Sequence, residues 1–108
     1  MRINWDAPIT DLAGNEVKDG AKPVTLATVA CNALIGVMPG DDKLSAKDKM
    51  ALYRLAVSAT DGGEQHLDVE QIVILKDRIA NAYNALIVGR CFDILEQAGD
   101  PKRNIKAV

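Results

Sequence analysis

The spacing of apolar residues between Thr25 and Gly99 constrains this chain more than any other feature of its sequence. Apolar residues recur there at steps of three and four, the period at which one face of an α-helix repeats. Two breaks, PGDDKL at 39–44 and DGGEQH at 61–66, interrupt the pattern, and both contain the glycine and aspartate typical of turns. The pattern predicts a mainly α fold, a small bundle of about four helices over 25–99.

The first helix is expected to begin after Thr25, a suitable N-cap, and to end at the glycines and proline of 36–40. Cys31 lies at the edge of its apolar face, where a small buried side chain fits, whereas Asn32 lies off that face. The residues expected to face the core are Leu26, Val29, Ala30, Ala33, Leu34 and Val37.

The second helix is expected to start at Ser45, because Asp48 follows three residues later, as in a capping box. Its apolar face is broad, which predicts that neighbouring elements touch it on two sides. The residues of this face are Leu52, Leu55, Ala56 and Ala59, widened by Met50, Tyr53 and Val57.

A third helix is expected to begin after the potential N-cap Asp68, and Glu70 lies favourably in its first turn. We expect a bend at Tyr83 and Asn84, because the apolar face shifts there, and then a fourth helix that ends near Gly99. The two expected faces are Ile72, Leu75, Ile79 and Ala82 with Val69 and Val73, and Ile87, Cys91, Ile94, Leu95 and Ala98.

Residues 1–24 are rich in Gly, Pro, Asp and Asn, and short runs flank Ala13 and Gly14. This composition predicts a β-hairpin or an extended arm that packs across the helices. Trp5, the one tryptophan of the chain, is the expected anchor. Residues 100–108 are expected to form a flexible basic tail.

Composition places limits on the class of protein. A chain of 108 residues with 48% hydrophobic residues suffices for one domain with one core. The net charge is -2 with both signs interspersed, so no overall basic field attracts nucleic acid. Two cysteines are too few for a secreted disulfide scaffold, and no signal peptide or membrane span is recognised. We therefore expect a reduced, cytoplasmic protein.

The chain lacks a diagnostic catalytic, metal or cofactor motif. Cys31 is expected in mid-helix, and only folding could bring His66, the one histidine, to it as a base. No Cys/His cluster or calcium loop is present, and the aspartates at 41–42 and in 61–64 are interpreted as solvated turns. We expect no enzyme and no cofactor, and an enzyme that uses Cys31 remains a minor alternative.

Five residues are the candidates for contact with a partner. Asn32 is expected off the core face, Tyr53 widens the second helix, and Tyr83 stands at the bend. Trp5 belongs to the arm, and Arg90 could reach a carboxylate or a partner. Gly89, beside Arg90, is interpreted as a packing residue, since glycine within a helix often marks a close approach.

A nucleic-acid interface would depend on two groups of basic residues. One lies at the start of the second helix and the other in the tail, but neither alternates with aromatic residues, which make up 4% of the chain. A small DNA-binding regulator of phage or prophage genes therefore stays as the alternative function. The two groups are Lys43, Lys47 and Lys49, and Lys102, Arg103 and Lys106.

The succession DLAGNEV, VTLATVACNALIG, DKLSAKDKMALYRLA, LDVEQIVILKDRI and AYNALIVGRCFDIL resembles small proteins encoded by bacteriophages and prophages. A hairpin with a G-x-x-V pattern that leads into a helical body is also similar to phage tail-assembly chaperones. The resemblance covers about residues 11–95 and consists of packing and capping patterns, so no functional residues carry over. It implies a phage or prophage origin, in the cytoplasm of a bacterial host.

These observations lead to one expected function. The chain is expected to be a non-enzymatic accessory protein that binds another protein of phage or host, in virion assembly or against a host factor. Its broad apolar faces exceed what one small core needs to cover, which favours an interaction surface or a homodimer.

Overall fold

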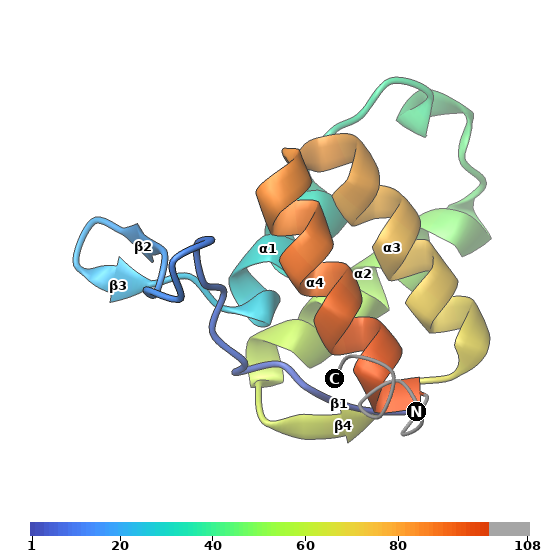
Figure 1. The fold of residues 1–108 in the computed structure, drawn as a ribbon. Coiled ribbons are helices and arrows are strands. Elements are labelled where there is room, and N and C mark those ends of the chain that lie inside the picture. Colours follow the sequence, from blue (N-terminus) through green and yellow to red (C-terminus); the bar gives the residue numbers. More distant parts are fainter. Residues whose placement is uncertain (100–108) are drawn as a thin grey trace.

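The computed structural model describes residues 1–99 of the chain, and the side chains as far as Glu96. Over this range the protein consists of four α-helices and two pairs of short antiparallel strands (Figure 1). The predicted mainly α fold with an N-terminal hairpin is confirmed. The expected flexible tail at 100–108 and the inward position of Ala98 fall outside the described residues and side chains.

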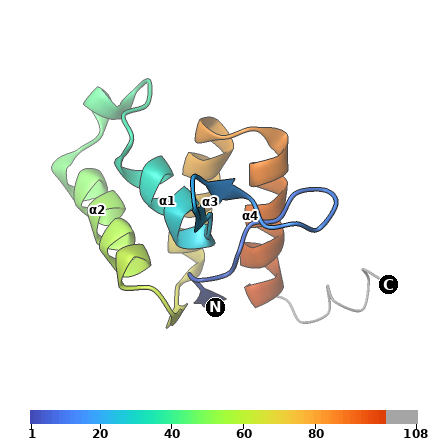
Figure 2. The same cartoon turned by 90° about the vertical axis from the view of Figure 1, so that its left-hand side faces the viewer.

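Figure 2 shows α2 and α4 on opposite sides of the molecule, with α1 and α3 between them. The helix α1 packs on both α2 and α3, and α3 in turn packs on α4. The predicted bend is confirmed, since α3 and α4 are separate helices joined at residues 83–84. The helices are α1 (Leu26–Ile35), α2 (Ala46–Asp61), α3 (Val69–Ala82) and α4 (Ala85–Gly99), with a short 3-10 helix η1 (Asp41–Lys43) before α2.

Each predicted N-cap performs its role. The side chains of Thr25 and Ser45 accept hydrogen bonds from the backbone N–H three residues later, and so begin α1 and α2. Asp68 forms a full capping box with Gln71, in which each side chain accepts from the backbone N–H of the other residue. Asn84 accepts from the N–H of Ile87 and so caps α4.

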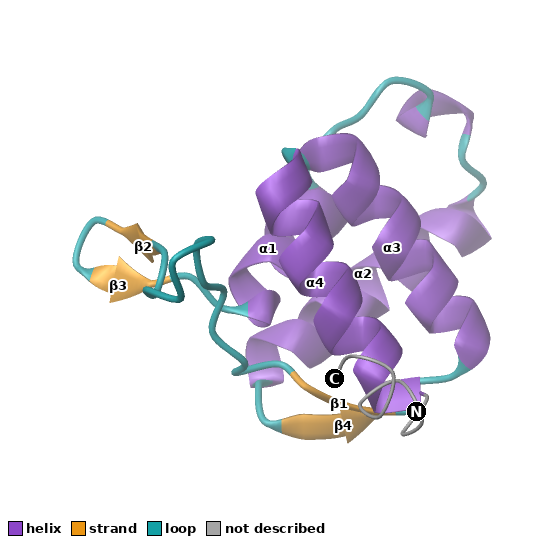
Figure 3. Cartoon of the chain, in the orientation of Figure 1, coloured by secondary structure: helices purple, strands orange, loops and turns teal. Residues whose placement is uncertain are grey.

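The strands lie at two places, coloured orange in Figure 3. The hairpin of β2 (Lys18–Asp19) and β3 (Lys22–Pro23) stands beside the helices. At the base of the bundle β1 (Arg2–Asn4) pairs with β4 (Glu64–His66), so that Ile3 lies opposite Gln65. The sequence predicted only a break at DGGEQH. The structure shows a turn at Gly62 and Gly63, both with positive φ, followed by a strand.

The N-terminal arm also completes α1. The carbonyl oxygens of Trp5 and Ala7 accept hydrogen bonds from the N–H groups of Ala27 and Leu26, each at 2.9 Å. These N–H groups belong to the first turn of α1 and have no acceptor within the helix. The arm is therefore part of the helical domain's hydrogen bonding, and its residues Ile3, Trp5 and Ile9 belong to the same core.

The core confirms most of the predicted inward faces and corrects some. Val37 is 93% exposed, because α1 ends at Ile35 and Gly36 directs the chain outward. Ala82 is exposed at the end of α3, and Val69 and Val73 face solvent on the same helix. The fully buried larger side chains are Ile3, Trp5, Ile9, Leu26, Val29, Leu55, Leu75, Ile79, Cys91 and Leu95.

Candidate functional site

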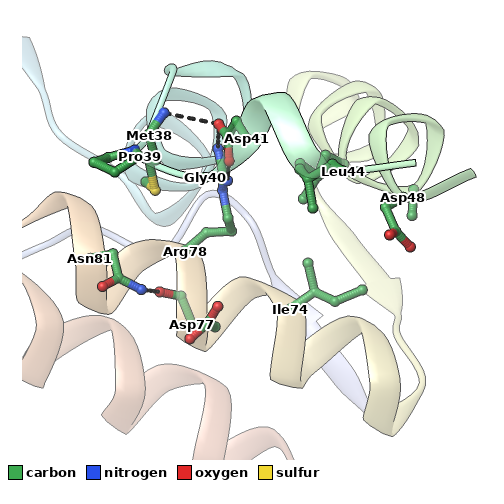
Figure 4. Close-up of a pocket in the computed structure, with 12 residues that line it drawn as sticks. Met38, Pro39, Gly40, Asp41, Leu44, Asp48, Ile74, Asp77, Arg78 and Asn81 are labelled. Atoms are coloured by element: carbon green, nitrogen blue, oxygen red, sulfur yellow. Dashed lines mark hydrogen bonds and ion pairs between the residues drawn. The ribbon is translucent and has the colours of Figure 1, made fainter. Parts of the chain in front are cut away.

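A groove of about 540 Å³ opens between α2 and α3 and is bounded on one side by the loop that follows α1 (Figure 4). Pockets of this size, lined by apolar side chains and a few polar groups, are the usual location of binding sites. Figure 4 shows Leu44 and Ile74 on opposite sides of the groove. The lining residues are Met38, Pro39, Gly40, Asp41, Leu44, Asp48, Ala51, Leu52, Ile74, Asp77, Arg78 and Asn81.

Arg78 forms one wall of the groove and is the central polar residue of the site. It extends from α3 and is only 8% exposed. Its Nε donates to the carbonyl oxygen of Ala33 at 2.9 Å, and its Nη2 donates to those of Gly36 at 2.8 Å and Leu34 at 3.4 Å. These carbonyls lie at the C-terminal end of α1, where the helix offers them no partner and its dipole favours a cation. Arg78 therefore caps α1 from a different helix.

Asp41 neutralises this buried guanidinium. Its two carboxylate oxygens accept from Nη1 and Nη2 of Arg78 at 2.6 Å and 3.1 Å, which is a bidentate pair. Oδ2 also accepts from the backbone N–H of Met38 at 2.9 Å. The hydrogen bond from Arg78, and then that from Met38, lower the pKa of the Asp41 carboxyl below its ordinary value of 3.8. The interpretation of Asp41 as part of a solvated turn is wrong, since this carboxylate fixes the loop after α1.

Two further carboxylates lie on the rim. Asp48 projects from the first turn of α2 and Asp77 from α3, and both residues are exposed. Neither carboxylate forms a salt bridge with another described residue. Asn81 lies beside Asp77, and its amide donates to the backbone carbonyl of Asp77 rather than to its carboxylate. The rim thus carries two carboxylates without a fixed counter-ion.

The chemistry of the groove suits recognition of a ligand. Its only guanidinium is engaged by Asp41 and three backbone carbonyls. The twelve lining residues include no serine, threonine, cysteine, histidine, lysine or tyrosine, so their ionisable groups are the carboxylates of Asp41, Asp48 and Asp77 and the guanidinium of Arg78. Among the described residues, no three His, Cys, Asp or Glu side chains gather as a metal site.

Trp5 is not available to a partner, and its prediction as an interaction residue is wrong. Its side chain is fully buried in the core, as its predicted role of anchor requires. Its Nε1 has no hydrogen-bond partner among the described residues. An unpaired indole N–H costs about 1–3 kcal/mol, which the burial of the large ring offsets.

The other four predicted residues are dispersed, and none lines the groove. Asn32 is exposed on α1, and Tyr53, 55% exposed, lies on the outer face of α2. Tyr83 is half-buried against the core at the junction of α3 and α4. Arg90 donates from Nε to the carbonyl oxygen of Thr10 at 3.1 Å and from Nη2 to that of Asp11 at 2.7 Å. Arg90 therefore holds the N-terminal arm on α4.

The two cysteines are space-filling residues. The Sγ of Cys31 lies 3.7 Å from the carbonyl oxygen of Ala56 and 3.6 Å from Oγ1 of Thr60, between α1 and α2. Cys91 is fully buried in α4, and this burial raises the pKa of its thiol to about 12. His66 belongs to β4, and its ring contacts the Met1 nitrogen. The structure does not bring it to Cys31.

Gly89 does not mark a close approach to any other described part of the structure. A Cβ atom built on it would meet nothing within 4 Å. The expected packing role is therefore wrong, since Gly89 lies on the exposed side of α4.

None of the described helices has the length and apolar character needed to cross a bilayer.

The groove residues escaped the sequence analysis for a physical reason. Arg78 lies three residues after Leu75 and directly before Ile79, so its helical position is at the edge of a buried face. A charged residue at such a position is a signal of a buried ion pair. Its partners, however, come from a loop 37 residues earlier, a separation that no local pattern reveals.

Comparison of the chain with models of protein families, with curated proteins and with solved structures found no match.

Proposed function

We propose that this protein is a non-enzymatic accessory protein of a phage or prophage and that it acts by binding another protein through the groove between α2 and α3. The observation that carries the proposal is the groove itself, an open depression with an apolar floor. Met38, Leu44, Leu52 and Ile74 all keep part of their surface accessible there. Apolar surface of this kind is stabilised when a partner covers it.

Two further observations support a binding role. The groove is preformed, because Arg78 and Asp41 fix the loop that bounds one side of it. A rigid site binds with less loss of conformational entropy than one that must order itself. The resemblance to small phage proteins supports a partner from virion assembly or from the host.

The DNA-binding alternative receives less support from the described residues. The lysines at the start of α2 are interspersed with Asp42 and Asp48, so no continuous basic surface forms there. The fourth helix, which follows a short turn as a recognition helix would, has the apolar sequence ALIVGRCFDILEQAG. A regulator would bind duplex DNA with an affinity that falls steeply between two salt concentrations.

The proposal is tested by site-specific photocrosslinking in cells of the bacterial host. A photoreactive phenylalanine analogue at Asn81, on the groove rim, is compared with the same analogue at Asp93, exposed on α4. We expect one defined protein adduct at position 81 and none at position 93. Absence of any adduct at position 81, or the same adducts at both positions, would contradict a role for the groove.

The captured protein is then purified and titrated against folded variants. We expect Leu44→Glu and Ile74→Glu to abolish its binding, because each places a carboxylate on the apolar floor. Val73→Glu is the matched control, since Val73 neighbours Ile74 but lies outside the groove and is already 59% exposed. Equal loss of binding in all three variants would assign the interface to another surface.

A further inference from the structure

The shape of the groove indicates the form of its ligand. Each of its apolar floor residues is half-buried, so the groove is an open trough and not an enclosed cavity. A small molecule usually has 70–90% of its surface covered in its site, roughly, and an open trough covers less than that. A volume of about 540 Å³ in an open trough suits instead a short stretch of polypeptide that inserts one or two side chains.

The charge of the groove indicates the chemistry of that stretch. Its lining contains the three carboxylates of Asp41, Asp48 and Asp77 and the single guanidinium of Arg78. Asp41 and Arg78 pair with each other, so the remaining charge is that of Asp48 and Asp77, on opposite helices. Lys49 adds some positive charge near Asp41, where it also lowers the pKa of that carboxyl. The acidic part of the rim is therefore the span between Asp48 and Asp77.

We infer that the groove binds a short peptide segment of another protein in which an apolar side chain is flanked by lysine or arginine. The apolar side chain would cover Leu44, Leu52 and Ile74, and the basic side chains would pair with Asp48 and Asp77. Charges so placed fix the register of the peptide and reject acidic sequences. The inference rests on the proposed protein-binding function and adds the chemistry of the partner.

The test uses three synthetic peptides and the full-length protein. The probe is acetyl-GKILRG-amide, one control is acetyl-GQILQG-amide, which lacks charge, and the other is acetyl-GKSSRG-amide, which lacks the apolar pair. Binding is followed by NMR through the backbone amides of Ile74, Asp77 and Asn81. We expect the probe to shift the resonances of these amides and to bind about tenfold more tightly than either control. The uncharged control loses two exposed ion pairs, and the other control loses a small apolar contact.

Matched charge variants locate the effect. The double variant Asp48→Asn and Asp77→Asn is expected to lower the probe's affinity about tenfold and to leave that of the uncharged peptide unchanged. The control is Asp19→Asn with Asp93→Asn, which alters the net charge equally at two exposed positions outside the groove. We expect this control to bind the probe like the original protein.

Three results would overturn the inference. If the probe and the uncharged peptide bind the groove equally, the basic chemistry is wrong while the groove remains a protein-binding site. If no peptide shifts the groove amides, the ligand is not a short peptide, and the crosslinking experiment alone decides the proposed function. If the protein self-associates and the Asp48→Asn, Asp77→Asn variant prevents it, the occupant is a second copy of the chain.

Discussion

The two ends of α1 are capped by groups from distant parts of the chain, but by opposite means. At the N-terminal end, the backbone carbonyls of Trp5 and Ala7 accept from two of the free N–H groups, beside the adjacent N-cap Thr25. At the C-terminal end, the guanidinium of Arg78 donates to the free carbonyls and is itself paired with Asp41. The first cap is neutral backbone, and the second is a buried ion pair.

This difference decides where a site can form. The backbone cap brings the arm directly onto α1, and Ile3, Trp5 and Ile9 fill the space beneath it. The side-chain cap reaches across from α3, so the loop after α1 is fixed without filling the space between α2 and α3. The N-terminal end is thereby closed, and the groove remains at the C-terminal end.

The largest expected effect comes from removing the charged cap. We expect Arg78→Met to lower the free energy of unfolding by about 3 kcal/mol, because Asp41 loses its counter-ion and three carbonyls lose their donor. Urea denaturation measures the change, and Arg54→Met, at an exposed position of α2, is the matched control. A loss no larger than that of the control would show that the charged cap does not stabilise α1.

Asp41→Asn tests the charged cap through the pH dependence of the free energy of unfolding. Its effect on stability is expected to be smaller than that of Arg78→Met. The pKa of Asp41 is lowered in the folded protein, so its contribution is fully present above pH 3.8 and is lost as the pH falls through the lowered value. We therefore expect the stability difference between the original protein and Asp41→Asn to shrink below pH 3.8. In the Arg78→Met background this pH dependence should weaken, because only the hydrogen bond from Met38 and the charge of Lys49 still lower the pKa of Asp41. A pH dependence that is unchanged by Arg78→Met would contradict the pairing.

The two hydrogen bonds by which Arg90 holds the N-terminal arm on α4 are expected to stabilise the protein less than the charged cap does. Arg90→Met removes two hydrogen bonds to backbone carbonyls and should cost about 1–2 kcal/mol. Hydrogen exchange should quicken at the arm amides of Val17 and Val24. At Gly36, at the far end of α1, exchange should change only as much as the global free energy of unfolding does. Equal acceleration at both ends would mean that the two caps act as one unit. Arg90→Lys should be intermediate, since an ammonium lacks the planar fork.

The smallest effect is expected at Gly89, where a side chain has room. Gly89→Ala should raise the stability by up to about 1 kcal/mol, because alanine favours the helix and its Cβ meets nothing within 4 Å. Gly36→Ala is the opposite case, since its Cβ would lie 2.6 Å from the carbonyl oxygen of Asn32. Thermal unfolding of the two variants should give shifts of opposite sign. A destabilised Gly89→Ala would indicate a contact that the monomer does not contain.

The helices could be predicted from the sequence because their signals are local. Thr25, Ser45 and Asp68 cap the helices they precede, and the shift of the apolar face at 83–84 marks the bend. A turn is present at Ala13 and Gly14 as predicted, since Thr10 bridges to Glu16 around it, but the strands β2 and β3 of the hairpin lie further along and turn at Gly20. Capping and periodicity act over a few residues, so a single sequence contains them in full.

The groove and the strand pair could not be predicted because they depend on residues far apart in the chain. The strand β4 has three residues, too few for an alternating pattern, and becomes a strand only by pairing with β1. Val37 continues the apolar spacing of α1 along the sequence but lies after the helix has ended, so the spacing alone does not place it correctly. Asp41 has an ordinary local explanation as a turn residue, the sequence assigns Arg78 no role, and only the fold places one against the other.

The pairing of β1 with β4 sets an order for the completion of the fold. Ile3 is synthesised before α1 and α2 but lies opposite Gln65, which the ribosome adds only after them. Contacts of such long sequence separation form late, because closing the intervening loop costs entropy. Trp5 is fully buried, and its backbone N–H donates to the carbonyl oxygen of Gly63, directly before β4, at 2.9 Å. We therefore expect the emission of this single tryptophan to change when the base of the bundle closes.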